Sequence, residues 1–161
     1  LVEVVKTQWT SGKYAKAMFD LLQVSGKTPV IVEKDVAGFI GNRLQHALWR
    51  EAISLVENGI CDAESVDTVV KASFGRRLAV LGPLENADLV GTDLTLDIHQ
   101  NVLFDLESHP GTSPYLQKMV KRGELGMKTG KGFRSWTDAE AVGTRKKVSK
   151  HLQKLEEILK N

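Results

Sequence analysis

Apolar residues recur at helical spacing over most of the chain. The longest pattern covers about residues 39–58, where apolar residues three or four positions apart form one stripe. Gly59 then stands where a helix commonly ends. The same spacing predicts a helix over residues 13–24, with the segment Thr10-Ser11-Gly12 before it to supply a cap, and a terminal helix from Asp138 onward.

Four shorter helices are expected between these long ones. Their predicted ranges are 62–73 with Asp62 as cap, 82–90, 92–106 with Thr92 as cap, and 114–122 with Ser113 as cap. Residues 125–136 contain Gly126, Gly130 and Gly132, so we expect an irregular segment there.

Two short stretches favour β-strands. Residues 1–5 and 29–32 are rich in Val and Ile, which fit a pleated sheet. With about seven helices, little strand and short connections, the chain is predicted to be mainly α. A strand at the very start also suggests that the chain continues from something longer.

Composition narrows the class of protein. The chain has 161 residues, 42% of them hydrophobic and 26% charged, as in globular domains. A chain of this length buries roughly 70% of its unfolded surface, so we expect a core. Lys and Arg total 22 against 20 Asp and Glu, a balance that argues against nucleic acid or a membrane surface as partner. The single cysteine, Cys61, excludes a disulfide within the chain and favours a reducing, cytoplasmic compartment.

The first candidate for chemistry is Asn42, near the start of the long helix. A carboxamide held at that positive end can donate a hydrogen bond to a carbonyl or oxyanion. His46 and Trp49 follow on nearly the same helical face. The alternative is that Asn42 is a buried polar residue whose hydrogen bonds are satisfied, with Gly38 and Gly41 allowing close packing.

The second candidate is the glycine-rich stretch 126–133 with Lys128. Glycines next to a lysine are typical of phosphate binding, but the spacing matches neither a P-loop nor Gly-x-Gly-x-x-Gly. The alternative is a kinked loop with solvated lysines.

Glu3, in the first predicted strand, is the third candidate. A carboxylate there can orient a histidine and raise its basicity; the alternative is an ordinary exposed carboxylate. The four histidines and Cys61 do not stand at metal-ligand spacing, so no metal site is expected.

Four segments, taken together, resemble the C-terminal domain of the 3-hydroxyacyl-CoA dehydrogenase family. They are Leu-Val-Glu-Val-Val (1–5), Asp-x-x-Gly-Phe-Ile-x-Asn-Arg (35–43), Leu-Gly-Pro-Leu-Glu-x-Ala-Asp-x-x-Gly-x-Asp (81–93) and Gly-x-Lys-Thr-Gly-x-Gly-Phe (126–133). The resemblance implies a helical, bundle-like domain of the 6-phosphogluconate-dehydrogenase-like type with a short N-terminal strand. It further implies that residues 1–33 are the end of an NAD-binding domain and a connector, 34–136 the substrate and dimerisation domain, and 137–161 a C-terminal helix.

The resemblance also implies the chemistry. Members oxidise a 3-hydroxyacyl-CoA to the 3-oxoacyl-CoA with NAD, and an upstream Rossmann domain supplies most of the NAD site and the catalytic histidine. By position, Glu3 matches the glutamate that pairs with that histidine, and Asn42 the asparagine near the substrate carbonyl. Lys128 matches a lysine that reaches the bound NAD. The implied assembly is a homodimer, and the chain is expected to be inactive without the upstream domain.

Departures from the family pattern leave the substrate open. Ala37 stands where many members have proline, and Arg76 and Arg77 lie in a segment that is apolar in many members. Two arginines suit a carboxylate, so one alternative is a sister dehydrogenase of a free hydroxy acid, of the carnitine or gulonate type. Another alternative is a helical dimerisation module without catalysis.

Overall fold

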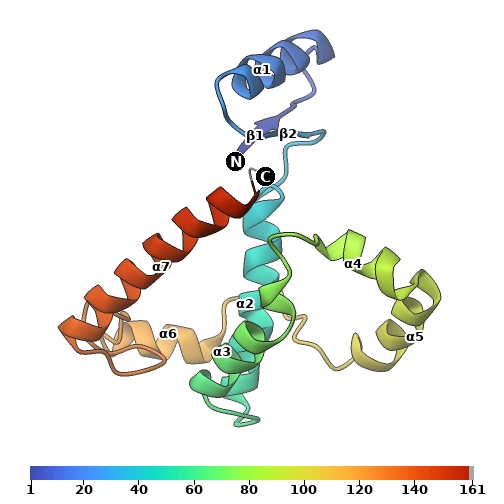
Figure 1. Ribbon diagram of the computed structural model, residues 1–161. Coiled ribbons are helices and arrows are strands. Elements are labelled where there is room, and N and C mark those ends of the chain that lie inside the picture. Colours follow the sequence, from blue (N-terminus) through green and yellow to red (C-terminus); the bar gives the residue numbers. More distant parts are fainter. Residues whose placement is uncertain (160–161) are drawn as a thin grey trace. The chain divides into compact units, whose positions relative to one another are not determined.

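The computed structural model describes residues 1–159, which form two compact units, Leu1–Arg50 and a second one from Glu51 onward (Figure 1). The predicted mainly α fold with a short N-terminal strand is confirmed. The described elements are β1 (Val2–Val5), α1 (Gly12–Val24), β2 (Pro29–Val32), α2 (Gly41–Glu57), α3 (Ala63–Ala72), the 3₁₀ turn η1 (Phe74–Arg76), α4 (Pro83–Val90), α5 (Thr92–Val102), α6 (Pro114–Lys121) and α7 (Asp138–Leu159). The predicted divisions at residues 33/34 and 136/137 stay predictions.

The first unit is a strand–helix–strand motif followed by the start of α2. β1 and β2 pair in parallel, with Val2 opposite Pro29 and Val5 opposite Val32. Within the predicted capping segment 10–12, Ser11 caps α1: its hydroxyl accepts a hydrogen bond from the Lys13 amide at 3.3 Å. The connection between the strands is the helix because parallel strands cannot be joined by a tight turn.

The second unit is helical, and polar contacts from α2 hold its connecting segments. Glu51 accepts a hydrogen bond from the Glu107 amide at 2.8 Å. One turn and a half further on, Glu57 accepts from the Ser113 hydroxyl at 2.8 Å and from the Tyr115 amide at 3.2 Å. These contacts fasten the segment between α5 and α6 to the end of α2.

Two predicted helix boundaries are wrong. The long helix starts at Gly41 rather than at residue 39, because Gly38 and Phe39 have φ values of +80° and +47°, which a right-handed helix excludes. Helix α5 is preceded by Gly91 as cap, with Thr92 as its first residue, and it ends at Val102 rather than Leu106. Beyond that end, the Glu107 amide donates to Glu51 instead of to a helical carbonyl.

The expected core is also wrong for the described chain taken alone. Its buried hydrophobic side chains are Ala15, Val32, Met119 and Ala141. The accessible surface is 12,694 Å², whereas a compact monomer of this mass exposes about 8,000 Å². The reason is that the amphipathic helices turn apolar faces outward: Leu84 and Phe104 are each 80% exposed.

None of the helices described over residues 1–159 combines the length and the apolar character needed to cross a membrane.

Candidate active site

Glu3 lies on β1 and caps the start of α2. Its Oε1 accepts hydrogen bonds from the backbone amides of Ile40, at 2.8 Å, and Gly41, at 3.1 Å. The left-handed turn at Gly38 and Phe39 delivers the chain so that both amides face this oxygen. The carboxylate therefore joins the strand to the positive end of the helix, where a negative charge is stabilised.

Asn42 is the second residue of α2, next to one of the amides that Glu3 binds. It is exposed, and over residues 1–159 its side chain makes no hydrogen bond. The alternative of a buried, satisfied Asn42 is therefore wrong. The structure brings Glu3 and Asn42 to the same helix end: the Glu3 carboxylate binds the amide of Gly41, and Asn42, with its carboxamide free of hydrogen bonds among the described residues, is the next residue in the chain.

His46 and Trp49 follow one and two turns along α2. Their rings meet edge to face, with centroids 4.9 Å apart and planes at 75°. The imidazole is thus packed against the indole, which gives it a structural contact on the helix surface.

The glycine loop (residues 125–132) contains the third predicted site residue and folds back on itself. The Gly126 amide donates to the Lys131 carbonyl at 2.7 Å, and the Thr129 hydroxyl bridges the Leu125 amide at 2.9 Å and the Lys131 carbonyl at 3.1 Å. A Cβ on Gly132 would lie 2.7 Å from the Gly126 Cα. That is too close for any side chain, so glycine is required where the two arms of the loop meet.

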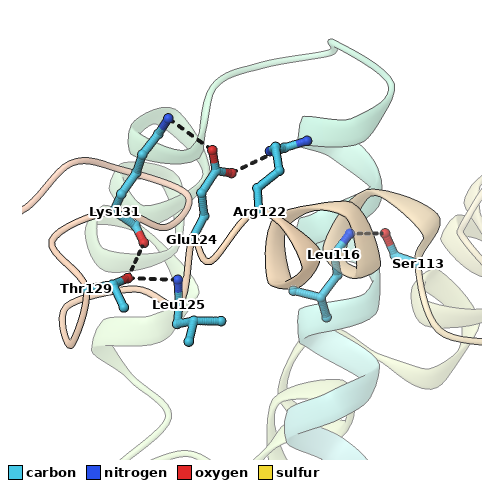
Figure 2. A network of polar contacts seen from close by, with 7 residues as sticks. All are labelled: Ser113, Leu116, Arg122, Glu124, Leu125, Thr129 and Lys131. Carbon is cyan, nitrogen blue, oxygen red and sulfur yellow. Dashed lines mark hydrogen bonds and ion pairs between the residues drawn. The ribbon is translucent and has the colours of Figure 1, made fainter.

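Glu124, the residue directly before this loop, binds a lysine within it (Figure 2). Its carboxylate forms ion pairs with Arg122 at 2.7 Å and Lys131 at 3.0 Å, and its side chain is only 13% exposed. Hydrogen bonds from Arg122 and Lys131 lower the pKa of Glu124 to about 2. Lys128, by contrast, is exposed and has no ion pair or hydrogen bond among the described residues. Of the two lysines in the loop, Lys131 is neutralised and Lys128 presents an unpaired cation.

The candidate residues fall in different units. Glu3 and Asn42 belong to the first unit, where both lie at the start of α2. Lys128 belongs to the glycine loop of the second unit. The capping role of Glu3 was missed by sequence reasoning, although the helix-start pattern around Gly38 and Gly41 lacks a conventional capping side chain.

Arg76 and Arg77 behave differently from each other. The Arg76 Nε donates to the Lys71 carbonyl at 2.9 Å and so serves the local turn η1. Arg77 is exposed and forms no side-chain contact within the described chain. Of these two arginines, Arg77 is therefore the one whose side chain is free to bind an anionic group.

A shallow groove of about 720 Å³ was not predicted. It lies between the start of α3, residues 133–136 and the first turns of α7. The Arg134 guanidinium stacks over the Trp136 ring at 4.8 Å beside it. Sequence reasoning could not find this groove because α3 and α7 are distant in the chain.

The chain is similar in sequence to a known protein family and to several of its members. The model of the 3-hydroxyacyl-CoA dehydrogenase C-terminal domain matches residues 38–136. The 5-formyl-3-hydroxy-2-methylpyridine 4-carboxylate 5-dehydrogenase of Mesorhizobium japonicum is 31% identical over 159 residues, which are 99% of this chain and 52% of that protein. The mitochondrial hydroxyacyl-coenzyme A dehydrogenase of Sus scrofa is 40% identical over 141 residues, covering 83% of this chain and 42% of that protein.

Solved structures agree. A crystal structure of 5-formyl-3-hydroxy-2-methylpyridine 4-carboxylic acid 5-dehydrogenase, described as an NAD⁺-dependent dismutase, gives a TM-score of 0.93 at 31% identity, over 99% of this chain and 52% of that one. The (S)-3-hydroxybutyryl-CoA dehydrogenase of Ralstonia eutropha gives 0.58 at 30% identity, over 84% and 47%. The chain thus spans about half the length of the relatives it matches. Its own sequence and fold, and not only the resemblance of four motifs, show that it belongs to the 3-hydroxyacyl-CoA dehydrogenase C-terminal domain family.

Proposed function

We propose that this chain is the C-terminal part of an NAD-dependent 3-hydroxyacyl-CoA dehydrogenase, which oxidises a 3-hydroxyacyl-CoA to the 3-oxoacyl-CoA. The observation that carries the proposal is the contact of Glu3 with the Ile40 and Gly41 amides, which puts a carboxylate and Asn42 at one helix end. The family match over residues 38–136 supports the reaction class.

Glu3 has two oxygens with different tasks in this proposal. Oε1 is engaged by the backbone of α2, whereas no hydrogen bond to Oε2 is found among the described residues. Oε2 is free to accept a hydrogen bond from the imidazole of a histidine outside this chain. That contact orients the ring as a general base and stabilises its protonated form after it takes the hydroxyl proton of the substrate.

Asn42 acts on the substrate oxygen. Its amide donates a hydrogen bond to the oxygen that changes from hydroxyl to carbonyl, and the α2 dipole adds a favourable field at the same point. Its freedom from internal hydrogen bonds leaves this donor available.

In this proposal the chain contributes one residue, Lys128, to the NAD site. When bound, NAD accepts the hydride from the substrate carbon. In the described chain, the unpaired Lys128 lies on a loop held by hydrogen bonds and ion pairs, and its cation suits an anionic group of the dinucleotide. The rest of the nucleotide site belongs to an NAD-binding domain upstream, so the chain alone is inactive.

The proposed assembly is a homodimer in a reducing, cytoplasmic compartment. The excess of exposed apolar surface over that of a compact monomer supports association, and the single Cys61 supports the compartment.

Complementation tests the proposal. The chain is mixed with a separately produced NAD-binding half of the same protein, and NADH formation from 3-hydroxybutyryl-CoA is followed by absorbance. We expect activity in the mixture only, with a large loss for Asn42→Ala and a wild-type rate for the surface control Lys150→Ala. An assembled mixture without NADH formation would contradict the proposal.

A second candidate is a dehydrogenase of a free acid that carries a carboxylate. Two observations favour it: Arg77 is unpaired, and the match to the pyridine carboxylate dehydrogenase covers 99% of the chain. A panel of hydroxy acids and their CoA thioesters on the complemented enzyme separates the two. If the substrate is a free acid, we expect Arg77→Ala to raise its KM by about tenfold or more, because a charge-assisted contact with the carboxylate is lost. If the substrate is a CoA thioester, we expect its KM to stay unchanged in this variant.

A further inference from the structure

Phe39 is the exception among the left-handed positions of the described chain. Its φ is +47°, and every other described residue with a positive φ is a glycine. A left-handed backbone brings the Cβ of any residue except glycine too close to a backbone oxygen, so this conformation strains Phe39. Such strain persists only where the surrounding structure fixes it, and it is concentrated at functional sites. Phe39 stands three residues before Asn42, so the strained position borders the candidate site.

Two hydrogen bonds hold the segment around Phe39 in this conformation. The Phe39 amide donates to the Val36 carbonyl at 3.1 Å and closes a four-residue turn. Gly38, with φ at +80°, takes the place in that turn that requires a positive φ. From α2, Arg43 Nη1 donates to the Ala37 carbonyl at 3.4 Å. The turn is thus tied to the helix that follows it, and the chain enters α2 through Phe39 in a fixed direction.

This turn presents two amides to one carboxylate. Successive backbone N–H groups beside a left-handed residue point to the same side and form a small anion-binding concavity. The amides of Ile40 and Gly41 both donate to Glu3 Oε1, at 2.8 and 3.1 Å. With Phe39 in a right-handed or extended conformation, these amides would face another direction. The place of the Glu3 carboxylate therefore depends on the backbone of Phe39.

We propose that Phe39 is a positioning residue, whose left-handed backbone sets where the Glu3 carboxylate stands relative to Asn42. Both ends of the proposed chemistry depend on this placement, since Glu3 supports the histidine that takes the proton and Asn42 binds the oxygen that loses it. Glu3 comes from β1 and Asn42 from α2, and the two hydrogen bonds to Glu3 Oε1 link these elements directly. The inference rests on the proposed function and assigns the alignment of its two groups to one residue.

Two substitutions separate the backbone of Phe39 from its ring. Phe39→Val and Phe39→Asn both remove the ring and leave side chains of similar size. Asparagine tolerates the left-handed conformation, whereas a β-branched residue strongly disfavours it. In the full chain, we expect the Ile40 and Gly41 amides to exchange hydrogen about tenfold faster in Phe39→Val than in Phe39→Asn. Equal exchange rates in the two variants would overturn the proposal.

The complemented enzyme tests whether this placement serves catalysis. We expect Phe39→Val to lower kcat about tenfold with an unchanged KM for NAD, and Phe39→Asn to keep kcat within about threefold of wild type. A displaced Glu3 no longer raises the basicity of the histidine, so the acid limb of the pH profile of kcat/KM moves to lower pH in Phe39→Val. A mere loss of folded protein would lower kcat without moving this limb. An unmoved limb, or equal kcat in the two variants, overturns the proposal.

A milder variant covers loss of folding. If Phe39→Val loses helical circular dichroism, Phe39→Ala is measured in its place; amide exchange faster than in Phe39→Asn supports the proposal, and equal exchange overturns it. A wild-type mixture that forms no NADH contradicts the proposed dehydrogenase. The exchange rates of Ile40 and Gly41 do not depend on that activity, so they still decide whether Phe39 holds Glu3 in position.

Discussion

Oε1 of Glu3 lies 2.8 Å from the backbone nitrogen of Ile40, although the two residues stand 37 positions apart in the chain. The contact ties the first strand to the start of α2, the helix that carries Asn42. A carboxylate proposed to serve a histidine therefore also holds the start of the helix that carries Asn42. Substitutions of Glu3 separate these two tasks.

Glu3→Ala removes the acceptor for the Ile40 and Gly41 amides. We expect a loss of about 1 kcal/mol in the free energy of unfolding, the usual cost of a lost helix cap. Glu3→Gln keeps a carbonyl oxygen in place, so its loss is smaller, but it removes the charge that supports the histidine. Urea unfolding and NADH formation in the complemented enzyme measure the two effects. Equal stability losses for both variants would show that the cap depends on charge.

Gly132→Ala tests the meeting of the two loop arms. The new Cβ would lie 2.7 Å from the Gly126 Cα, and relieving that clash costs about 1–3 kcal/mol. Gly143→Ala is the matched control, since its Cβ meets nothing within 4 Å and alanine favours a helix by up to about 1 kcal/mol. Thermal unfolding should lower Tm for the first and leave it equal or higher for the second.

Thr129→Val removes the hydroxyl that bridges the Leu125 amide and the Lys131 carbonyl. We expect faster hydrogen exchange of the Leu125 amide and weaker NAD binding by the complemented enzyme, because the loop no longer holds Lys128 in place. Thr129→Ser retains the hydroxyl and should restore both. Lys128→Ala should weaken NAD binding without changing the Leu125 exchange rate; unchanged NAD affinity in this variant would contradict the role of Lys128 itself.

Acid should loosen the loop through Glu124. Its pKa is lowered to about 2 from an ordinary value of 4.5, because Arg122 and Lys131 favour the ionised carboxylate. The stabilisation it gives is therefore fully present above pH 4.5 and is lost as the pH falls toward 2. In Glu124→Gln this contribution is absent at every pH. The difference in loop amide exchange between the two proteins should shrink to zero over that range, and a constant difference would contradict the ion-pair assignment.

The sequence by itself determined the local elements. Asp62 and Ser113 each accept a hydrogen bond from a backbone amide at the helix that they were predicted to cap, and Ser11 does so within the predicted segment 10–12. These predictions hold because a cap depends on residues three or fewer positions away. The family was also readable, since its motifs are short and contiguous, and the match of the family model at residues 38–136 confirms that prediction. The roles of Glu3, Asn42 and Lys128 stay predictions.

Tertiary structure decided what depends on distant residues. The Glu3 cap needs β1 beside the turn at Gly38, and the Glu124 ion pairs need the loop to close so that Lys131 returns to it. The start of α2 was misjudged because local apolar spacing does not report a left-handed backbone at Phe39. The core was misjudged for a related reason: a hydrophobic pattern specifies which face of a helix avoids water, but not whether the covering surface belongs to the same chain.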